Sequence, residues 1–190
     1  LVVDHILSKG KGPVVVNLST TKAVEDIAYK YKVNFFRAKV GEINVVEEMK
    51  KRNALIGGEG NGGVISPEVH LGRDSLAGIG YILEMMSVKK KKVSEIMKGM
   101  PAYYMKKGKV TLSVNNDINS LLNGIKDEFR NEKISDIDGL RIDFIKNEKF
   151  NNGWVHLRSS NTEPVFRIIA ESDSKSKTDK IYKYFAGLIK

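Results

Sequence analysis

The chain has 190 residues, 41% of them hydrophobic, which is enough for one large domain or two small ones with separate cores. It has no cysteine, so disulfides and thiolate metal sites are excluded, and no apolar run approaches the roughly 20 residues of a membrane-spanning helix. Lysine and arginine outnumber aspartate and glutamate by 32 to 23, a net charge of +9 that favours anionic partners.

The first part of the chain alternates between strand and helix patterns. Asn44 and Asp74 are the expected N-caps of its last two helices. The last helix is apolar on most sides, so we expect it to be buried. This alternation predicts an α/β layered domain, at residues 1–92. The sequence predicts strands at residues 13–19 and 33–36, and helices at residues 21–31, 44–52 and 75–86.

The second part of the chain contains more strands than helices. Asp138–Gly139 is the expected turn before the second of these strands. Several strands with a helix at each end of the block predict an α+β domain at residues 93–190, in which helices cover an antiparallel sheet. The sequence predicts strands at residues 109–114, 139–145, 154–158 and 165–170, and helices at residues 117–130 and 181–188.

Two lysine clusters, residues 89–92 and 106–109, fall between structured segments in this interpretation. Neither is interleaved with the aromatic side chains that single-strand nucleic-acid binders use for stacking, so we interpret both as solvated linker lysines. The chain opens with LVVDHIL, without an initiator methionine, a basic leader or a cleavage site. We therefore expect a piece of a longer protein. Because it lacks cysteine, we expect that protein in the cytoplasm, with no membrane association.

The loop RSSNTEP, between the last two predicted strands, is dense in hydrogen-bonding groups. A loop between strands has backbone N–H groups that are not paired in the sheet, and the planar guanidinium of Arg158 adds further donors. Ser160, Asn161 and Thr162 add side-chain donors. Arg167 follows on the next strand at a spacing that would let it face the same space. Such a cluster suits a phosphate group, and the alternative is a polar turn that only reverses the chain.

The glycine-rich segment GGEGNGGVISPE, at residues 57–68, literally satisfies the dinucleotide pattern G-x-G-x-x-G. That pattern binds a pyrophosphate when it opens a helix, whereas here an extended VISP with Pro67 follows, and no Lys-Ser/Thr pair completes a P-loop. We therefore reject a nucleotide cofactor. The loop presents Glu59 and Asn61, a carboxylate beside an amide, which suits adjacent sugar hydroxyls. A purely structural turn is the alternative.

The two loops together resemble those of a known enzyme family. GGEGNGG and RSSNTEP are similar to the sugar-binding and phosphate-binding loops of the α-D-phosphohexomutases, the superfamily of phosphoglucomutase, phosphomannomutase and phosphoglucosamine mutase. RSSNTEP is the more specific of the two. RAKVG, LGRD and DGLRI extend the resemblance over nearly the whole chain. It implies the third and fourth of the family's four domains, an α/β layer structure and an α+β domain.

The resemblance also implies what the chain lacks. The family's nucleophilic serine lies in a Thr-Ala-Ser-His-Asn-Pro-type loop and its magnesium in an Asp-Gly-Asp-Gly-Asp-Arg-type run; both belong to the first two domains, and neither occurs here. In the complete enzyme, an isomerase, a phosphoserine gives its phosphoryl group to a hexose monophosphate, and magnesium and positioning carry most of the transfer. We expect this chain to bind hexose phosphate, to hold no metal, to need the missing N-terminal half as partner and to be inactive alone.

Residue by residue, the resemblance places Glu59 and Asn61 at the sugar hydroxyls. Lys39 matches a lysine near the substrate that would help with charge or proton transfer, with a plain surface lysine as the alternative. Many relatives end the sugar loop in His where this chain has Gly63, which makes the family's rules for choosing among sugars unsafe here, and His70 is the nearest candidate to substitute. The residues assigned to the phosphate that is not transferred are Arg158, Ser160, Asn161 and Thr162, with Arg167 as a helper.

The sequence thus predicts the C-terminal half of a phosphohexomutase of the phosphomannomutase or phosphoglucosamine mutase type. One alternative is a noncatalytic phosphosugar-binding protein. The other, ranked lower, is a basic nucleic-acid-binding protein, whose binding would fall steeply with salt and would not be competed by hexose phosphates. The substituent at the second carbon of the sugar and the oligomeric state stay open at this point.

Overall fold

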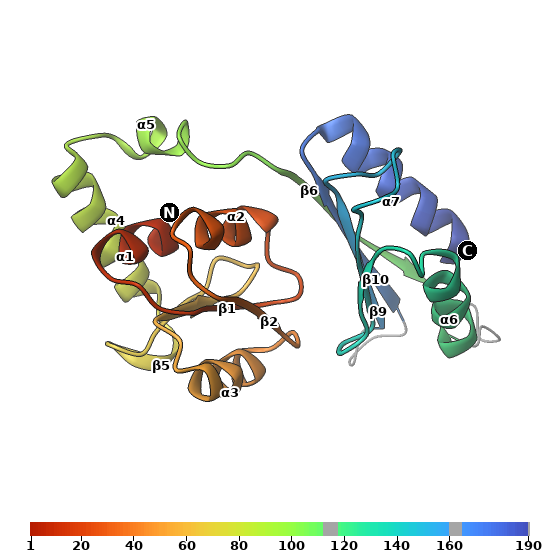
Figure 1. The fold of residues 1–190 in the computed structure, drawn as a ribbon, viewed down its shortest axis with the longest axis horizontal. Coiled ribbons are helices and arrows are strands. Elements are labelled where there is room, and N and C mark those ends of the chain that lie inside the picture. The colour runs from red at the N-terminus through yellow and green to blue at the C-terminus, as the bar shows by residue number, and fades with distance from the viewer. Residues whose placement is uncertain (112–117, 160–164, 190) are drawn as a thin grey trace. The chain divides into compact units, whose positions relative to one another are not determined.

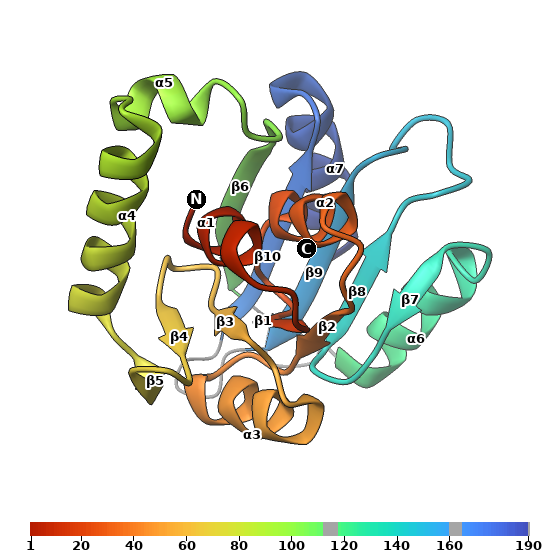
Figure 2. The same ribbon diagram turned by 60° about the vertical axis from the view of Figure 1, so that its left-hand side comes forward.

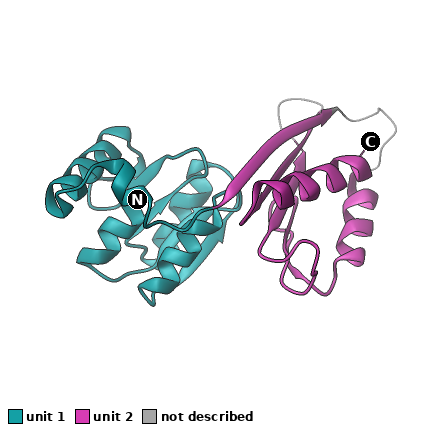
Figure 3. Cartoon of the chain, turned by 90° about the horizontal axis from the view of Figure 1, so that it is seen from above, with its two compact units in different colours: residues 1–102 teal, residues 103–190 magenta. Residues whose placement is uncertain are grey.

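A computed structural model describes residues 1–111, 118–159 and 165–189, and the chain divides into two compact units, residues 1–102 and 103–190 (Figure 3). The division lies beyond the expected boundary after Lys92. The short helix that follows Lys92 belongs to the first unit, because Ile96 is buried and Met100 packs against the core of that unit. No helix in the described ranges is long and apolar enough to cross a membrane.

The first unit is a mixed five-stranded sheet between layers of helices, which confirms the expected α/β layered domain (Figure 1). The strand order is β2-β1-β3-β4-β5; β1 is parallel to β2 and β3, whereas β4 and β5 continue the sheet in antiparallel pairing. The elements are α1 (Val2–Lys9), β1 (Val14–Asn17), α2 (Lys22–Lys30), β2 (Phe35–Ala38), α3 (Glu42–Arg52), β3 (Ile56–Gly58), β4 (Val64–Ser66), β5 (His70–Arg73), α4 (Ser75–Lys89) and α5 (Val93–Met97).

Strand β1 is apolar along its length because helices cover both faces of the sheet. Val14 and Val16 pack with Ile27 of α2 in one cluster, which also contains side chains of α1. Val15 points to the other face and packs with Met49 of α3. Strand β1 is therefore buried throughout, and its one polar residue, Asn17, lies at its carboxyl end.

The second unit is a five-stranded antiparallel sheet with α6 and α7 on one face, which confirms the expected α+β domain (Figure 2). The strand order is β6-β10-β9-β8-β7. Phe129, directly after α6, and Phe185 of α7 pack in one core with Leu157 of β9 and Ile168 of β10. The elements are β6 (Tyr104–Thr111), α6 (Ile118–Glu128), β7 (Lys133–Ser135), β8 (Leu140–Asp143), β9 (Trp154–Ser159), β10 (Val165–Ser172) and α7 (Lys175–Ile189).

One of the two expected helix caps is confirmed and the other is wrong. The Asp74 side chain accepts a hydrogen bond from the backbone N–H of Ala77 and caps α4. Asn44 lies inside α3, which begins earlier, after Gly41. Gly41 has a φ of +122°, a conformation that glycine adopts at low cost, so the chain turns into the helix there. The Asn44 amide donates instead to the carbonyl of Val40.

The expectation that α4 is a buried helix is also wrong. Met85 is buried, but Leu76 is 80% exposed, and Ile79 and Leu83 are exposed as well. Helix α4 contacts α1 and β4 on one side only, because it lies at the edge of the layered unit. The apolar sequence of a helix does not show how many helices and strands pack against it, and that number determines how much of the helix is buried.

One of the two lysine clusters is a linker in the structure and the other is not. Residues 90–92 are exposed and connect α4 to α5, as expected, with Lys89 as the last residue of α4. Residues 106–109 instead lie within β6, which pairs with β10 along its whole length. Lys106 forms an ion pair with Asp179 of α7 and lies over the ring of Tyr182. The sequence did not predict a strand at residues 106–108, because lysine and glycine are not typical of strands. Pairing with β10 holds these residues in the extended conformation.

Candidate functional site

The carboxyl ends of the parallel strands β1, β2 and β3 meet at one edge of the first sheet. In α/β sheets this edge is where ligands bind, because the loops there diverge to opposite faces at the point where the strand order reverses. Asn17 ends β1, Lys39 follows β2, and Glu59 follows β3. The structure therefore places two residues expected to contact the sugar substrate, Lys39 and Glu59, at the same edge of one sheet.

The Glu59 carboxylate is buried and held in place from three sides. Its Oε1 accepts a hydrogen bond from Nδ2 of Asn17 at 3.0 Å and from the backbone N–H of Gly41 at 3.3 Å. Its Oε2 lies 3.2 Å from Nη1 of Arg73. A carboxylate has about four lone-pair positions, so it can still accept from a ligand hydroxyl in this fixed orientation.

The loop that follows Glu59 closes on itself. The backbone N–H of Gly62 donates to the carbonyl of Glu59, and the N–H of Glu59 donates to the carbonyl of Gly63, each at 3.0 Å. The exposed Asn61 accepts from the backbone N–H of Gly63 through its Oδ1. That oxygen therefore serves the turn, and the amide nitrogen of Asn61 is the group left to donate to a ligand.

Asn17 and Arg37 support this edge and were not recognised as site residues in the sequence. Buried Asn17 donates to Glu59 and accepts from the backbone N–H of Ser19 and the hydroxyl of Thr20. Arg37 donates to the carbonyl of Thr20 at 2.9 Å and pairs with a carboxylate of α2 at 3.1 Å. Asn17 could have been recognised from the sequence, because it ends the apolar run VVVN and a buried polar side chain needs hydrogen-bond partners.

Lys39 is exposed, and its ammonium group forms no hydrogen bond or ion pair with the residues that the structure describes. It lies two residues before Gly41, whose N–H donates to Glu59. The ammonium group is therefore available at the edge that holds the carboxylate. A flexible cation in this place suits a group that meets the substrate's charge.

In the second unit, Arg158 of β9 and Arg167 of β10 are direct cross-strand partners. Their side chains share the face opposite α6 and α7, since the neighbouring Leu157 and Ile168 point into the helix-covered core. Arg158 is partly buried, with its guanidinium 3.8 Å from the carboxylate of Asp138. The other residues expected in the phosphate loop, Ser160, Asn161 and Thr162, lie outside the described residues.

A buried histidine anchors the turn beside Arg158. His156 lies on the same face of β9, and its Nε2 donates to the carbonyl of Asp138 at 2.7 Å. Burial lowers the pKa of His156 from 6.5 to about 4, against the opposing effect of this hydrogen bond. The imidazole is therefore neutral at pH 7, and it holds the turn at Gly139, whose φ is +70°.

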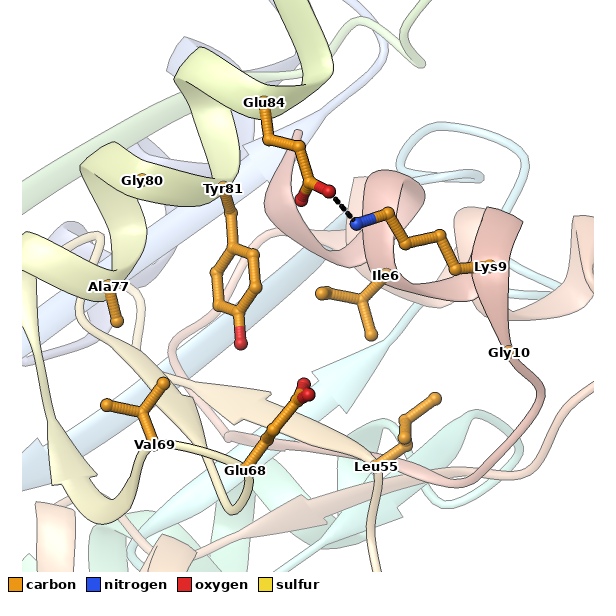
Figure 4. A pocket seen from close by; sticks show the side chains of 10 residues that line it. All are labelled: Ile6, Lys9, Gly10, Leu55, Glu68, Val69, Ala77, Gly80, Tyr81 and Glu84. Atoms are coloured by element: carbon orange, nitrogen blue, oxygen red, sulfur yellow. Dashed lines mark hydrogen bonds and ion pairs between the residues drawn. The ribbon is translucent and has the colours of Figure 1, made fainter. Parts of the chain in front are cut away.

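A hollow of about 730 Å³ lies elsewhere in the first unit, between α1, α4 and the turn from β4 to β5 (Figure 4). Tyr81 and Glu68 point into it, and Lys9 pairs with Glu84 on its wall. Leu55, which also lines it, directly precedes β3. The hollow thus lies at the opposite end of β3 from Glu59 and contains none of the expected site residues.

The described residues do not fit a magnesium site. Across residues 1–111, 118–159 and 165–189, no three histidine, aspartate or glutamate side chains are arranged to hold a metal ion. Magnesium requires several oxygen ligands in octahedral geometry, whereas Glu59 shares its carboxylate with an amide, a backbone N–H and a guanidinium. Metal ligands for the reaction would come from outside the described part of the chain.

Comparison with known proteins agrees with this geometry. The model of the phosphoglucomutase/phosphomannomutase alpha/beta/alpha domain III matches residues 1–104, and the model of the C-terminal domain of the same family matches residues 116–188. The two units therefore define a pair of mutase-type domains. The chain belongs to the phosphoglucomutase/phosphomannomutase family, within the α-D-phosphohexomutase superfamily, and carries its domain III and C-terminal domain.

The relatives are considerably longer than this chain. A phosphoglucomutase/phosphomannomutase of Thermococcus kodakarensis is 36% identical over 180 residues, which cover 93% of this chain and 38% of the relative. A probable phosphoglucosamine mutase of Pyrococcus horikoshii is 31% identical, over 100% and 42% of the two chains. A solved family member from Burkholderia thailandensis shares the fold, with a TM-score of 0.73, 21% identity and coverage of 98% and 39%. The chain spans about two fifths of these relatives.

Proposed function

We propose that this chain is the sugar- and phosphate-binding part of a phosphohexomutase of the phosphomannomutase or phosphoglucosamine mutase type. The observation that carries the proposal is the Glu59 carboxylate, held by Asn17, Gly41 and Arg73 at the edge of the sheet where ligands bind. Family membership adds the class of substrate, a hexose phosphate. A solved relative, the N-acetylphosphoglucosamine mutase of Aspergillus fumigatus, was crystallised with GlcNAc-6P and magnesium.

In this proposal the first unit binds sugar hydroxyls and the second unit binds a phosphate group. Glu59 accepts hydrogen bonds from sugar hydroxyls, and Asn61 donates to a neighbouring oxygen. Arg158 and Arg167 contribute the positive charge of a phosphate clamp, which Ser160, Asn161 and Thr162 complete with hydroxyl and amide donors. The phosphate held here is the one that is not transferred.

Lys39 is the proposed catalytic residue of this chain. Its exposed ammonium group, at the same sheet edge as Glu59, would offset negative charge or move a proton near the sugar. The phosphoserine and the magnesium that carry the transfer itself belong to an N-terminal part that this chain does not contain, and we propose that part as its partner in the cytoplasm. Bound magnesium would neutralise negative charge on the phosphoryl group during its transfer.

The experiment that tests this function combines binding and turnover. The full chain, labelled with ¹⁵N, is titrated with mannose 1-phosphate, glucose 1-phosphate and inorganic phosphate and followed by NMR. We expect hexose phosphates to shift the amides of Glu59 to Gly63 as well as those near Arg158, and inorganic phosphate to shift the second group only.

Turnover is followed by phosphorus NMR in the presence of magnesium and a trace of the hexose bisphosphate. The chain alone is expected to show none, because it has neither the serine loop nor the acidic metal run, and the serine- and metal-bearing part should restore it. Binding without restored turnover would favour a noncatalytic phosphosugar-binding protein. Robust turnover by the chain alone would contradict the proposal.

A further inference from the structure

The side chain of Arg73 lies in the space that a side chain at position 63 would enter. A Cβ atom at position 63 would lie 2.5 Å from Cδ and 2.9 Å from Cγ of Arg73, closer than real Cβ contacts. The aliphatic stem of Arg73 therefore crosses the sugar loop directly over Gly63. Arg73 is placed there by β5, where it pairs with Ile65 of β4. A side chain at position 63 and the present course of Arg73 exclude each other.

The guanidinium of Arg73 extends from this crossing to the Glu59 carboxylate. Nη1 lies 3.2 Å from Oε2 of Glu59, and Nε donates to Glu42 at the start of α3. This hydrogen bond from Arg73 lowers the pKa of Glu42, so the carboxylate stays ionised and keeps its hold on the guanidinium. Arg73 is thus fixed at both ends, by Glu42 and Glu59.

Arg73 still has donors to offer. A guanidinium carries five N–H groups, and Nη2 forms no hydrogen bond or ion pair with the described residues. The side chain is 43% exposed, so these N–H groups reach solvent beside the carboxylate. An acceptor and a donor side by side match a sugar hydroxyl and its neighbour, because the carboxylate accepts from one O–H while the guanidinium donates to the adjacent oxygen.

We propose that Arg73 is a ligand-binding residue of the sugar loop, which donates to a hydroxyl oxygen of the hexose phosphate next to the hydroxyl that Glu59 recognises. Its stem occupies the space that a side chain at position 63 would enter. This inference rests on the proposed function. His70, the substitute considered from the sequence, pairs instead with Asp74, the N-cap of α4, at 3.5 Å.

Arg73→Gln tests the proposal, because glutamine keeps part of the stem over Gly63 and removes the charge and the fork. Affinity for mannose 1-phosphate, measured by NMR titration of the full chain, should fall by about tenfold, the loss expected for a charge-assisted hydrogen bond. Affinity for inorganic phosphate should not change. Arg52→Gln is the matched control, since Arg52 is comparably exposed and pairs with Glu48 on α3. It should bind both ligands like the wild type.

The exchange at position 63 gives an independent measurement. Gly63→His combined with Arg73→Ala should bind mannose 1-phosphate more tightly than Arg73→Ala alone, because the ring enters the space that the stem vacates. If Arg73→Gln disturbs the amide spectrum, Arg73→Lys keeps the charge beside Glu59, loses the fork and should still weaken sugar binding.

The outcomes separate this inference from the proposed function. Wild-type affinity in the folded Arg73→Gln or Arg73→Lys variant would overturn the role of Arg73 while leaving the function standing. A wild-type chain that binds inorganic phosphate but shows no shift of the Glu59 loop with any hexose phosphate would overturn both.

Discussion

Arg158 and Arg167 lie directly opposite each other on the antiparallel strands β9 and β10, with their side chains on the same face of the sheet. Like charges in such a pair destabilise a sheet. Asp138, 3.8 Å from Arg158, offsets part of this charge. The pair is arranged so that an anion bound between the strand ends would relieve the repulsion, which is the physical reason to expect phosphate there.

Replacing Arg158 with lysine should weaken phosphate binding. Lysine keeps the charge but loses the two-pronged donor geometry, so affinity for hexose phosphate and for inorganic phosphate should fall by about 1–3 kcal/mol. Titration calorimetry or NMR would measure it. Arg130→Lys, at an exposed arginine after α6, is the control and should have no effect. Equal affinities for the Arg158 variant and the wild type would remove Arg158 from the clamp.

Glu59→Gln should separate sugar recognition from phosphate recognition. Glutamine has the same shape, but its amide nitrogen replaces one acceptor oxygen, so hydroxyl recognition weakens by about 1–2 kcal/mol. Inorganic phosphate is expected to bind in the other unit, so its affinity should not change. Titrations of the variant with mannose 1-phosphate and with inorganic phosphate compare the two. A parallel loss for both ligands would show that Glu59 only maintains the structure.

Asn17→Ala should destabilise the first unit by about 2–3 kcal/mol. The substitution leaves the buried Glu59 carboxylate, the Ser19 N–H and the Thr20 hydroxyl without the partner that all three share. Urea unfolding followed by circular dichroism measures the change. Asn34→Ala, at an exposed position before β2, serves as the control and should shift the midpoint little. Similar midpoints for both variants would show that the Asn17 network contributes little.

The stability of the second unit should fall as the pH drops from about 6.5 to about 4. Folding lowers the pKa of His156 from 6.5 to about 4, so in this window the unfolded chain binds a proton that the folded chain does not. The stability is fully present above pH 6.5 and declines by up to about 3 kcal/mol on reaching pH 4. Trp154, the single tryptophan, lies buried in this unit, so its fluorescence reports the unfolding.

His156→Gln is the matched variant for this pH profile. Glutamine retains an N–H donor for the Asp138 carbonyl but does not titrate, so the difference between the two profiles isolates the histidine. The variant should lose less stability between pH 6.5 and pH 4 than the wild type. Parallel profiles would mean that carboxylates cause the whole decline.

Gly139→Ala should destabilise the second unit by about 2 kcal/mol. Gly139 has a φ of +70°, and a Cβ atom there would lie 2.2 Å from the carbonyl oxygen of Leu157. Gly124→Ala is the opposite case, because Gly124 lies inside α6 with nothing within 4 Å of an added Cβ. It should stabilise the unit by about 0.5–1 kcal/mol. Tryptophan fluorescence during denaturation compares both, and equal effects would contradict the structural assignment of the turn.

Local physical chemistry made much of this protein predictable from its sequence. The run PVVVNLS predicted β1 because a strand covered on both faces must be apolar. Asp74 was recognised as a cap because a short acceptor before an apolar helix satisfies its first N–H groups. The loop at Glu59 was recognised as a candidate binding loop because its glycines and its carboxylate are adjacent in the chain. Each of these features depends on neighbours within a few residues.

The expectations that failed depended on contacts distant in the chain. The burial of α4 depends on how many elements surround it, and the lysines at residues 106–109 form a strand because β10 pairs with them. Helix α3 begins before Asn44 because Gly41 supplies the turn. Contacts of this kind cannot be predicted from the types of residues within one segment.

The order of residue types along the chain predicted an α/β domain followed by an α+β domain, and it showed which chemical groups each candidate loop carries. Contacts between distant segments establish which of these residues lie together. Register places Arg158 opposite Arg167, the parallel strand ends bring Asn17 to Glu59, and β5 lays Arg73 over Gly63. These partners come from different strands or different loops, so only the pairing of strands within each sheet brings them together.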